Sequence, residues 1–326
     1  GGDGDDLLGG VLGSNTLLIG GNGADIFFFG NDGVADTQII SDFNRSEDTI
    51  RFKDVTATGL TLNFDGNDTT ITYAQETIIV QGVNLTGGGA PSDLLVVDQS
   101  FETDTAGWET IDNGFLGTIN RIQNDGVGIE ATDGNWYAQF LETFGIGSRY
   151  LLGQHGDAFP GDFRVGMDVY LDTSIATGEG LNFTITLNDV NNVQLRQYVF
   201  NVAQDASTGQ FLVGMSNTRG IDPLTNIETG THTAIANSDW FRFEHVFTDN
   251  NGVLEVDMNL YNSAGNLVLT KHFMDPGDLI PGVVSGNNFA WLTNIDIANG
   301  VLIDNYEVAL IGQGPTTPAF DWAEFV

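Results

Sequence analysis

The chain has 326 residues, and its 44 Asp and Glu against 10 Lys and Arg give a formal net charge of −34 at pH 7. Such a field repels phosphate backbones and anionic lipid surfaces, so nucleic acids and membrane surfaces are excluded as partners. The absence of cysteine excludes a disulfide framework, and no apolar run approaches the ~18 residues of a membrane-spanning helix.

Residues 1–30 repeat with a period near nine, in three copies of a Gly/Asp-rich motif. Glycine permits the positive φ of a sharp turn, the following carboxylate points back into the turn, and the next apolar residue enters a short strand. Each copy is therefore predicted to form half a coil of a parallel β-roll. Stacked turns bring main-chain carbonyls and carboxylates together in an oxygen-only cage of the kind that Ca²⁺ prefers. The turn glycines of these predicted calcium sites are Gly2, Gly4, Gly13, Gly21 and Gly23.

These repeats resemble the nonapeptide repeats of RTX proteins, G-G-x-G-x-D-x-U-x, which the first and third copies match at every fixed position. The resemblance implies calcium between stacked turns, with Asp6 and Asp25 as ligands. In the second copy Asn15 stands where the family has Asp, so this site is expected to be weaker. Asp42 and Asp48 lie in a segment that looks like the family's cap, and each is either a further ligand or a solvated loop carboxylate.

The roll and its cap are predicted to occupy residues 1–86, closed by short strands near 68–74 and 77–81. The Gly/Pro/Ser-rich residues 87–93 read as a linker. Because the chain begins inside a repeat, we expect it to be the C-terminal portion of a longer or processed protein.

Residues 94–311 show many short runs of period-two alternation and no sustained 3.6-residue apolar period, which predicts an antiparallel β-sandwich of jelly-roll type. The fold class is therefore all-β. Within this region Trp108 and Trp240 are assigned to the core because their flanking strands alternate around them. The clearest predicted strands are 163–171, 181–187, 195–202, 240–247, 253–260, 266–271 and 301–309.

The hairpin of residues 239–247 and 253–261 resembles that of concanavalin-type lectin sandwiches and carbohydrate-binding jelly rolls. The resemblance implies glycan binding, in which sugar rings stack on exposed aromatic faces and polar side chains bond the hydroxyls. Burial in the core is the alternative for each aromatic candidate. The candidates beside turn-like segments are Trp136, Tyr137, Arg149, Tyr150 and Trp291.

A calcium ion between loops of the sandwich is a separate hypothesis, with Glu102, Asp296 and Asp304 as its candidate ligands. These carboxylates lie near the two ends of the predicted domain, where jelly rolls of this kind often hold such an ion.

We predict no catalytic site. Lectin-like glucanases carry E-x-D-x-x-E on one strand, whereas here Glu255 and Asp257 are followed by Leu260 where the general acid belongs. His155 invites comparison with polysaccharide lyases but sits in a turn-like segment. A polysaccharide hydrolase or lyase is therefore kept only as an alternative.

The tail, residues 312–326, ends in an acidic residue followed by apolar ones, which resembles the export signal of RTX proteins that leave bacteria by type I secretion. We therefore expect a secreted, extracellular or cell-surface, calcium-binding protein without catalytic activity. Its sandwich is predicted to bind a polysaccharide or cell-surface glycan. The alternative is a structural subunit that binds copies of itself in a surface layer, fibre or sheath.

Overall fold

The computed structural model describes most of the chain as β-strands, together with the 3₁₀ turn η2 (Ile227–Thr229). The described residues contain no α-helix, which confirms the predicted all-β fold class. Gly13, His155, the predicted linker and the tail lie outside the described residues. The description covers residues 1–310 except 10–14, 31–32, 54–59, 86–94, 111–116, 125, 127, 142–147, 154–162, 190, 192, 218–226 and 280–287.

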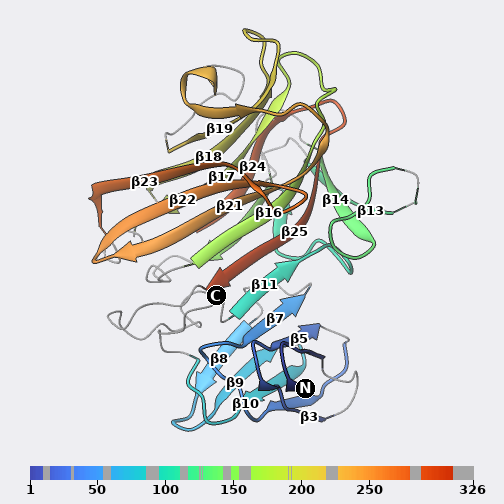
Figure 1. The fold of residues 1–326 in the computed structure, drawn as a ribbon, viewed down its shortest axis with the longest axis vertical. Helices are drawn as coiled ribbons and strands as arrows, with labels where there is room; N and C mark the ends of the chain where they lie inside the picture. Colours follow the sequence, from blue (N-terminus) through green and yellow to red (C-terminus); the bar gives the residue numbers. More distant parts are fainter. Residues whose placement is uncertain are drawn as a thin grey trace.

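Two walls of parallel strands form the N-terminal roll, drawn in blue in Figure 1. The first wall contains β2 (Leu7–Gly9), β5 (Ile26–Gly30) and β7 (Thr49–Lys53), and the second contains β3 (Thr16–Leu18), β6 (Thr37–Ile40) and β10 (Glu76–Val80). The cap strands β9 (Thr69–Tyr73) and β8 (Leu60–Phe64) extend the second wall, so the predicted strands near 68–74 and 77–81 are confirmed. The short strands β1 (Gly2–Asp3) and β4 (Gly21–Asn22) pair in parallel at the turns.

Strand alternation fills the space between the walls with apolar side chains. Phe27 and Ile50 are register partners in parallel strands and are both fully buried. Phe52 and Tyr73, from opposite walls, pack edge to face with ring centroids 5.2 Å apart. The roll therefore has a hydrophobic core of its own.

Two antiparallel sheets form the sandwich. The first contains β11 (Leu95–Gln99), β25 (Val301–Leu310), β16 (Phe163–Leu171), β21 (Asp239–Asn250), β22 (Val253–Asn262) and β23 (Leu267–Leu279), with β14 (Trp136–Leu141) and β13 (Thr118–Gln123) attached to β25. The second contains β12 (Trp108–Thr110), β15 (Ser148–Gly153), β24 (Asn288–Asp296), β17 (Gly180–Asn188), β18 (Gln194–Gln204), β19 (Phe211–Ser216) and β20 (Thr231–Ala234). Strand β23 continues past the predicted end at residue 271 and includes Pro276. Proline has no N–H to donate to a neighbouring strand, but β23 lies at the edge of its sheet, where this is tolerated.

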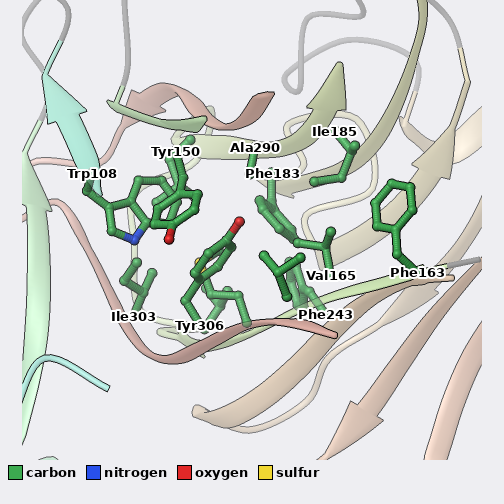
Figure 2. Close-up of a cluster of buried hydrophobic side chains, with 14 of the residues drawn as sticks. Trp108, Tyr150, Phe163, Val165, Phe183, Ile185, Phe243, Ala290, Ile303 and Tyr306 are labelled. Atoms are coloured by element: carbon green, nitrogen blue, oxygen red, sulfur yellow. The ribbon is translucent and has the colours of Figure 1, made fainter. Parts of the chain in front are cut away.

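The sandwich core is rich in aromatic rings, as Figure 2 shows. Trp108 packs edge to face against Tyr306 with centroids 5.0 Å apart, and Phe200 packs against Phe243 at 4.7 Å. Trp108 and Trp240 are 7% and 8% exposed, so their predicted core positions are confirmed.

The roll and the sandwich share one continuous sheet. Strand β11 pairs in parallel with β7 of the roll and antiparallel with β25 of the sandwich, as can be followed in Figure 1. Across β11, Arg51 on β7 forms an ion pair with Glu307 on β25 at 2.8 Å. The predicted domain boundary falls among residues outside the description and stays a prediction.

Glu307 is the centre of a buried charge cluster. Besides Arg51, it forms ion pairs with Arg164 of β16 at 2.7 Å and with Arg242 of β21. Burial by itself would raise the pKa of Glu307, but the charges of Arg242, Arg164 and Arg51 lower it to about 2. The ionised carboxylate therefore ties strands of the roll and the sandwich together.

We expect Glu307→Gln to lower the free energy of unfolding by about 3–5 kcal/mol, because it leaves three partly buried guanidinium charges without their shared, buried partner. Denaturant unfolding followed by circular dichroism measures this loss. The matched control Glu109→Gln removes the exposed pair with Arg149 and should change stability by less than about 1 kcal/mol. Equal losses in the two variants would contradict the central role of Glu307.

The same residue predicts a pH dependence. Since its folded pKa of about 2 lies below the ordinary value of 4.5, ionised Glu307 stabilises the fold above pH 4.5 and this contribution is lost as the pH falls to 2. The difference in unfolding free energy between wild type and Glu307→Gln should shrink by about 3 kcal/mol over this range. A difference that stays constant with pH would refute the assigned ionisation.

Candidate functional site

Asp6, Asp25 and Asp48, which we call the carboxylate ladder, stand at the starts of the strands in the first wall of the roll. The main-chain N–H of Asp6 donates to Asp25 Oδ1 at 2.9 Å, and the N–H of Asp25 donates to Asp48 Oδ1 at 3.0 Å. Asp48 Oδ2 accepts the N–H of Asn44 at 2.7 Å within its own turn. The carboxylates of Asp25 and Asp48 thus each fix the register of the preceding coil.

The ladder concentrates negative charge inside the protein. Asp25 and Asp48 are 0% and 2% exposed, and within the described part of the chain neither forms an ion pair with Lys or Arg. Burial is the largest effect on the pKa of Asp48 and raises it, and the charges of Asp25 and Asp42 add to this increase. The hydrogen bonds from the N–H groups of Asn44 and Asp25 lower this pKa but do not outweigh the increase. Asp25 Oδ2 is buried and accepts no hydrogen bond from any residue that the structure describes. A buried carboxylate oxygen in this condition is unfavourable unless a cation is nearby.

Glycine allows the turns beside the ladder to stack closely. Gly21 and Gly23 have φ values of 105° and 128°, a region that other residues rarely adopt. A Cβ on either residue would collide with the carbonyl oxygen of Gly2 or Gly4 in the preceding coil. The turn therefore combines main-chain carbonyl oxygens with the oxygens of the ladder.

The other predicted calcium ligands bind main-chain groups of neighbouring coils. Asp42 accepts the N–H groups of Gly20 and Gly21, both at 2.9 Å. Asn15 Oδ1 accepts the N–H of Thr37 at the start of β6, also at 2.9 Å. Both side chains therefore already stabilise the stacking of the coils.

The calcium ion predicted between loops of the sandwich, with Glu102, Asp296 and Asp304 as candidate ligands, stays a prediction. Glu102 Oε1 accepts the N–H groups of residues 135 and 136 at 2.7 and 2.8 Å. Asp304 Oδ2 accepts those of residues 132 and 133 at 2.7 and 3.0 Å, while Asp296 is exposed. Throughout the described ranges no three His, Asp or Glu side chains converge to hold a metal by themselves. Glu102 and Asp304 anchor the loop before β14.

A cleft of about 530 Å³ opens at one end of the sandwich, between the β13–β14 hairpin and the loops 172–179 and 297–300. Tyr137 is the one residue of this cleft that was also predicted from the sequence. The others come from segments far apart in the chain, so no local motif marks them.

Two carboxylates hold the loops around the cleft. Asp172 Oδ1 accepts the N–H and the hydroxyl of Ser174 at 2.9 and 2.6 Å, and the Ser174 hydroxyl lowers the pKa of Asp172. Glu179 Oε2 accepts the N–H of Ala176 at 2.8 Å, and its Oε1 accepts that of Ala298 at 3.4 Å. Glu179 therefore joins the two loops across the rim.

A cluster of three aromatic rings adjoins the cleft. Trp240 packs edge to face against Tyr137 and Tyr170, with ring centroids 6.0 and 5.5 Å away. Its Nε1–H donates to the carbonyl of Glu130 at 2.7 Å. Burial and the charge of Asp172 raise the pKa of Tyr170, so the Tyr170 hydroxyl stays protonated at neutral pH.

The five residues predicted to bind glycan do not form one site. Tyr150 is 1% exposed and packs against Tyr306 at 4.8 Å, so its prediction as a glycan contact is wrong because its side chain faces the core. Tyr137 is 8% exposed and lines the cleft. Trp136 is half-buried beneath the guanidinium of Arg121, 4.3 Å from its ring centroid.

Arg149 and Trp291 lie on a different sheet from Trp136. They are register partners on β15 and β24, and the Arg149 guanidinium lies 5.6 Å from the centroid of the Trp291 ring. Both side chains are half-buried. Their role in glycan binding stays a prediction.

The carboxylates of the incomplete glucanase motif have partners on neighbouring residues. Glu255 accepts a hydrogen bond from Asn250 at 2.7 Å, and Asp257 pairs with His272 at 2.8 Å.

His245 is fully buried, where desolvation lowers its pKa to about 3, and its Nε2 lies 3.1 Å from the Tyr198 carbonyl. It is therefore a neutral core residue that joins the two sheets.

No protein-family model and no curated protein matches this sequence. Among solved structures, the chain is similar to the CBM2 module of the evolved Dit of Lactobacillus casei BL23 phage J-1, with TM-score 0.39, 11% identity, and 67% and 95% of the two chains covered. It is also similar to the Emp47p carbohydrate recognition domain, with TM-score 0.39, 10% identity, and 71% and 100% covered.

The enzymatically active domain of bacteriophage CBA120 tailspike protein 2 is a further similar structure, with TM-score 0.36, 12% identity, and 96% and 50% of the two chains covered. Within the described residues no helix has the length and hydropathy needed to span a membrane.

Proposed function

We propose that this chain is an extracellular, non-catalytic protein whose roll binds calcium and whose sandwich binds a glycan. The calcium proposal is carried by the buried, unpartnered Asp25 Oδ2 beside the stacked glycine turns. The glycan proposal is carried by the cleft at the end of the sandwich, where polar groups converge in a largely apolar wall.

Calcium fits the donor chemistry of the ladder. Two carboxylate oxygens would be supplied by Asp25 Oδ2 and Asp6 Oδ1. Neither oxygen accepts a hydrogen bond among the described residues. The carbonyls of Gly2 and Gly4 would add neutral oxygens, so the set is the hard, all-oxygen one that Ca²⁺ prefers. A bound cation would neutralise the buried charge of the ladder, which couples binding to folding of the roll.

This coupling agrees with the proposed route of export. A chain of the RTX kind would stay unfolded in the calcium-poor cytosol of a bacterium and fold in millimolar external calcium. The resemblance of the tail to a type I secretion signal is the sequence feature that supports this route.

Self-assembly is the second candidate function, and the two ends of the long sheet favour it. Strands β2 and β23 lie at opposite ends of this sheet, and each pairs with one strand only in the described topology. They expose Leu7 at 73%, Leu267 at 53% and Met274 at 53%. Exposed apolar edge strands are templates for pairing with another copy.

We expect a chelator to lower the unfolding temperature of the roll, because calcium that binds only the folded state stabilises it by about 2.7 kcal/mol at 100 times Kd. Calorimetry with and without chelator measures the shift. Asp25→Asn should abolish most of this shift. The control Asp65→Asn, in the turn between β8 and β9 of the same roll, should retain it. A full calcium response in Asp25→Asn would refute the assigned site.

For the sandwich, we expect selective retention on one class in a panel of immobilised polysaccharides in millimolar calcium. Ala176→Trp places a large side chain on the rim of the cleft and should weaken retention at least about tenfold, by loss of contact area. The matched control Ala264→Trp, on the exposed β22–β23 turn, should bind as wild type. Unchanged binding by Ala176→Trp would exclude the cleft, and retention on no glycan would favour self-assembly.

A further inference from the structure

The wall of the cleft is aliphatic at several places. Ile122 of β13, Ile129 beyond that strand, Ile175 of the loop 172–179 and Ile297 of the loop 297–300 all line it. Each is half-buried, so part of each side chain faces the open space of the cleft. These isoleucines offer methyl-sized apolar contacts.

Flat stacking of a sugar ring has little support in this cleft. Tyr137 is 8% exposed because it packs against Trp240. Tyr170 packs against the same indole, with the two ring centroids 5.5 Å apart. A ligand therefore gains apolar contact from the isoleucines more than from an open aromatic face.

The charges at the cleft select against anions. The lining contains the carboxyl groups of Asp172 and Glu179 and no Lys or Arg among the residues described. Asp172 is ionised at neutral pH, since its hydrogen bonds with Ser174 lower its pKa. Its Oδ2 accepts no hydrogen bond within the described structure, whereas Oδ1 binds Ser174. This oxygen is available to a hydroxyl or amide N–H of a ligand.

We propose that the cleft selects uncharged saccharides that carry a methyl group, which is supplied either by an N-acetyl substituent or by the C6 methyl of a 6-deoxy sugar. This inference rests on the proposed glycan function and names its ligand class. The methyl group packs among the isoleucines, and a neighbouring hydroxyl or amide N–H donates to Asp172 Oδ2. Uronic acids and sulfated sugars bring a negative charge toward Asp172 and Glu179 and are disfavoured.

The test uses the whole chain with isotope-labelled isoleucine δ1 methyl groups, observed by NMR in millimolar calcium. Two matched pairs of probes differ at the group in question: N,N′,N″-triacetylchitotriose against cellotriose, and L-fucose against L-galactose. Trigalacturonate is the anionic probe. In at least one pair the methyl-bearing member should bind about tenfold more tightly than its partner. The tighter-binding member should shift the methyl resonances of Ile122, Ile129, Ile175 and Ile297, but not those of the roll residues Ile40 and Ile71. The pair that shows this preference identifies the source of the methyl group.

Ile175→Thr should reduce this discrimination several-fold, because it replaces an apolar contact with a hydroxyl. The control Val193→Thr changes a residue that is 56% exposed and absent from the cleft lining, and it should retain the discrimination. Equal binding within both pairs, or tightest binding of trigalacturonate, would overturn the methyl inference while leaving glycan binding intact. If no probe shifts the cleft isoleucines and the polysaccharide panel also gives no retention, the proposed glycan function itself fails.

Discussion

The hydrogen bonds between successive aspartates of the carboxylate ladder set the register on which the N-terminal roll depends. Asp25 receives the N–H of Asp6, and Asp48 receives that of Asp25, so β2, β5 and β7 begin in step. Strand β7 then pairs with β11, which pairs with β25 of the sandwich. The cost of this arrangement is buried negative charge, and that cost is the physical reason to propose a cation.

Elsewhere the acidic side chains serve the main chain in the same way. Glu102 and Asp304 accept N–H groups of the loop before β14, and Glu179 joins the two loops at the cleft. Glu307 differs because it binds arginines, which neutralise it inside the shared sheet. Much of the chain's excess of carboxylates is thus used for turns and loops, where short polar acceptors satisfy otherwise unpaired N–H groups.

Periodicity in the sequence was sufficient to predict the parallel strands of the roll and the long strands of the sandwich. Local patterns decided less about the sites. Alternation shows that Tyr150 and Arg149 face opposite ways but not which of them faces the core, and Tyr150 proved to be buried. The cleft joins loops 172–179 and 297–300 with β14, and only the folded topology brings these segments together.

Anomalous diffraction from crystals grown in millimolar calcium tests the central claim most directly, since it locates the metal without reference to any activity. The account predicts a calcium peak beside Asp25 Oδ2, at the stacked turns of residues 1–6 and 20–25. A structure in which this oxygen binds only water or protein groups at millimolar calcium would contradict it.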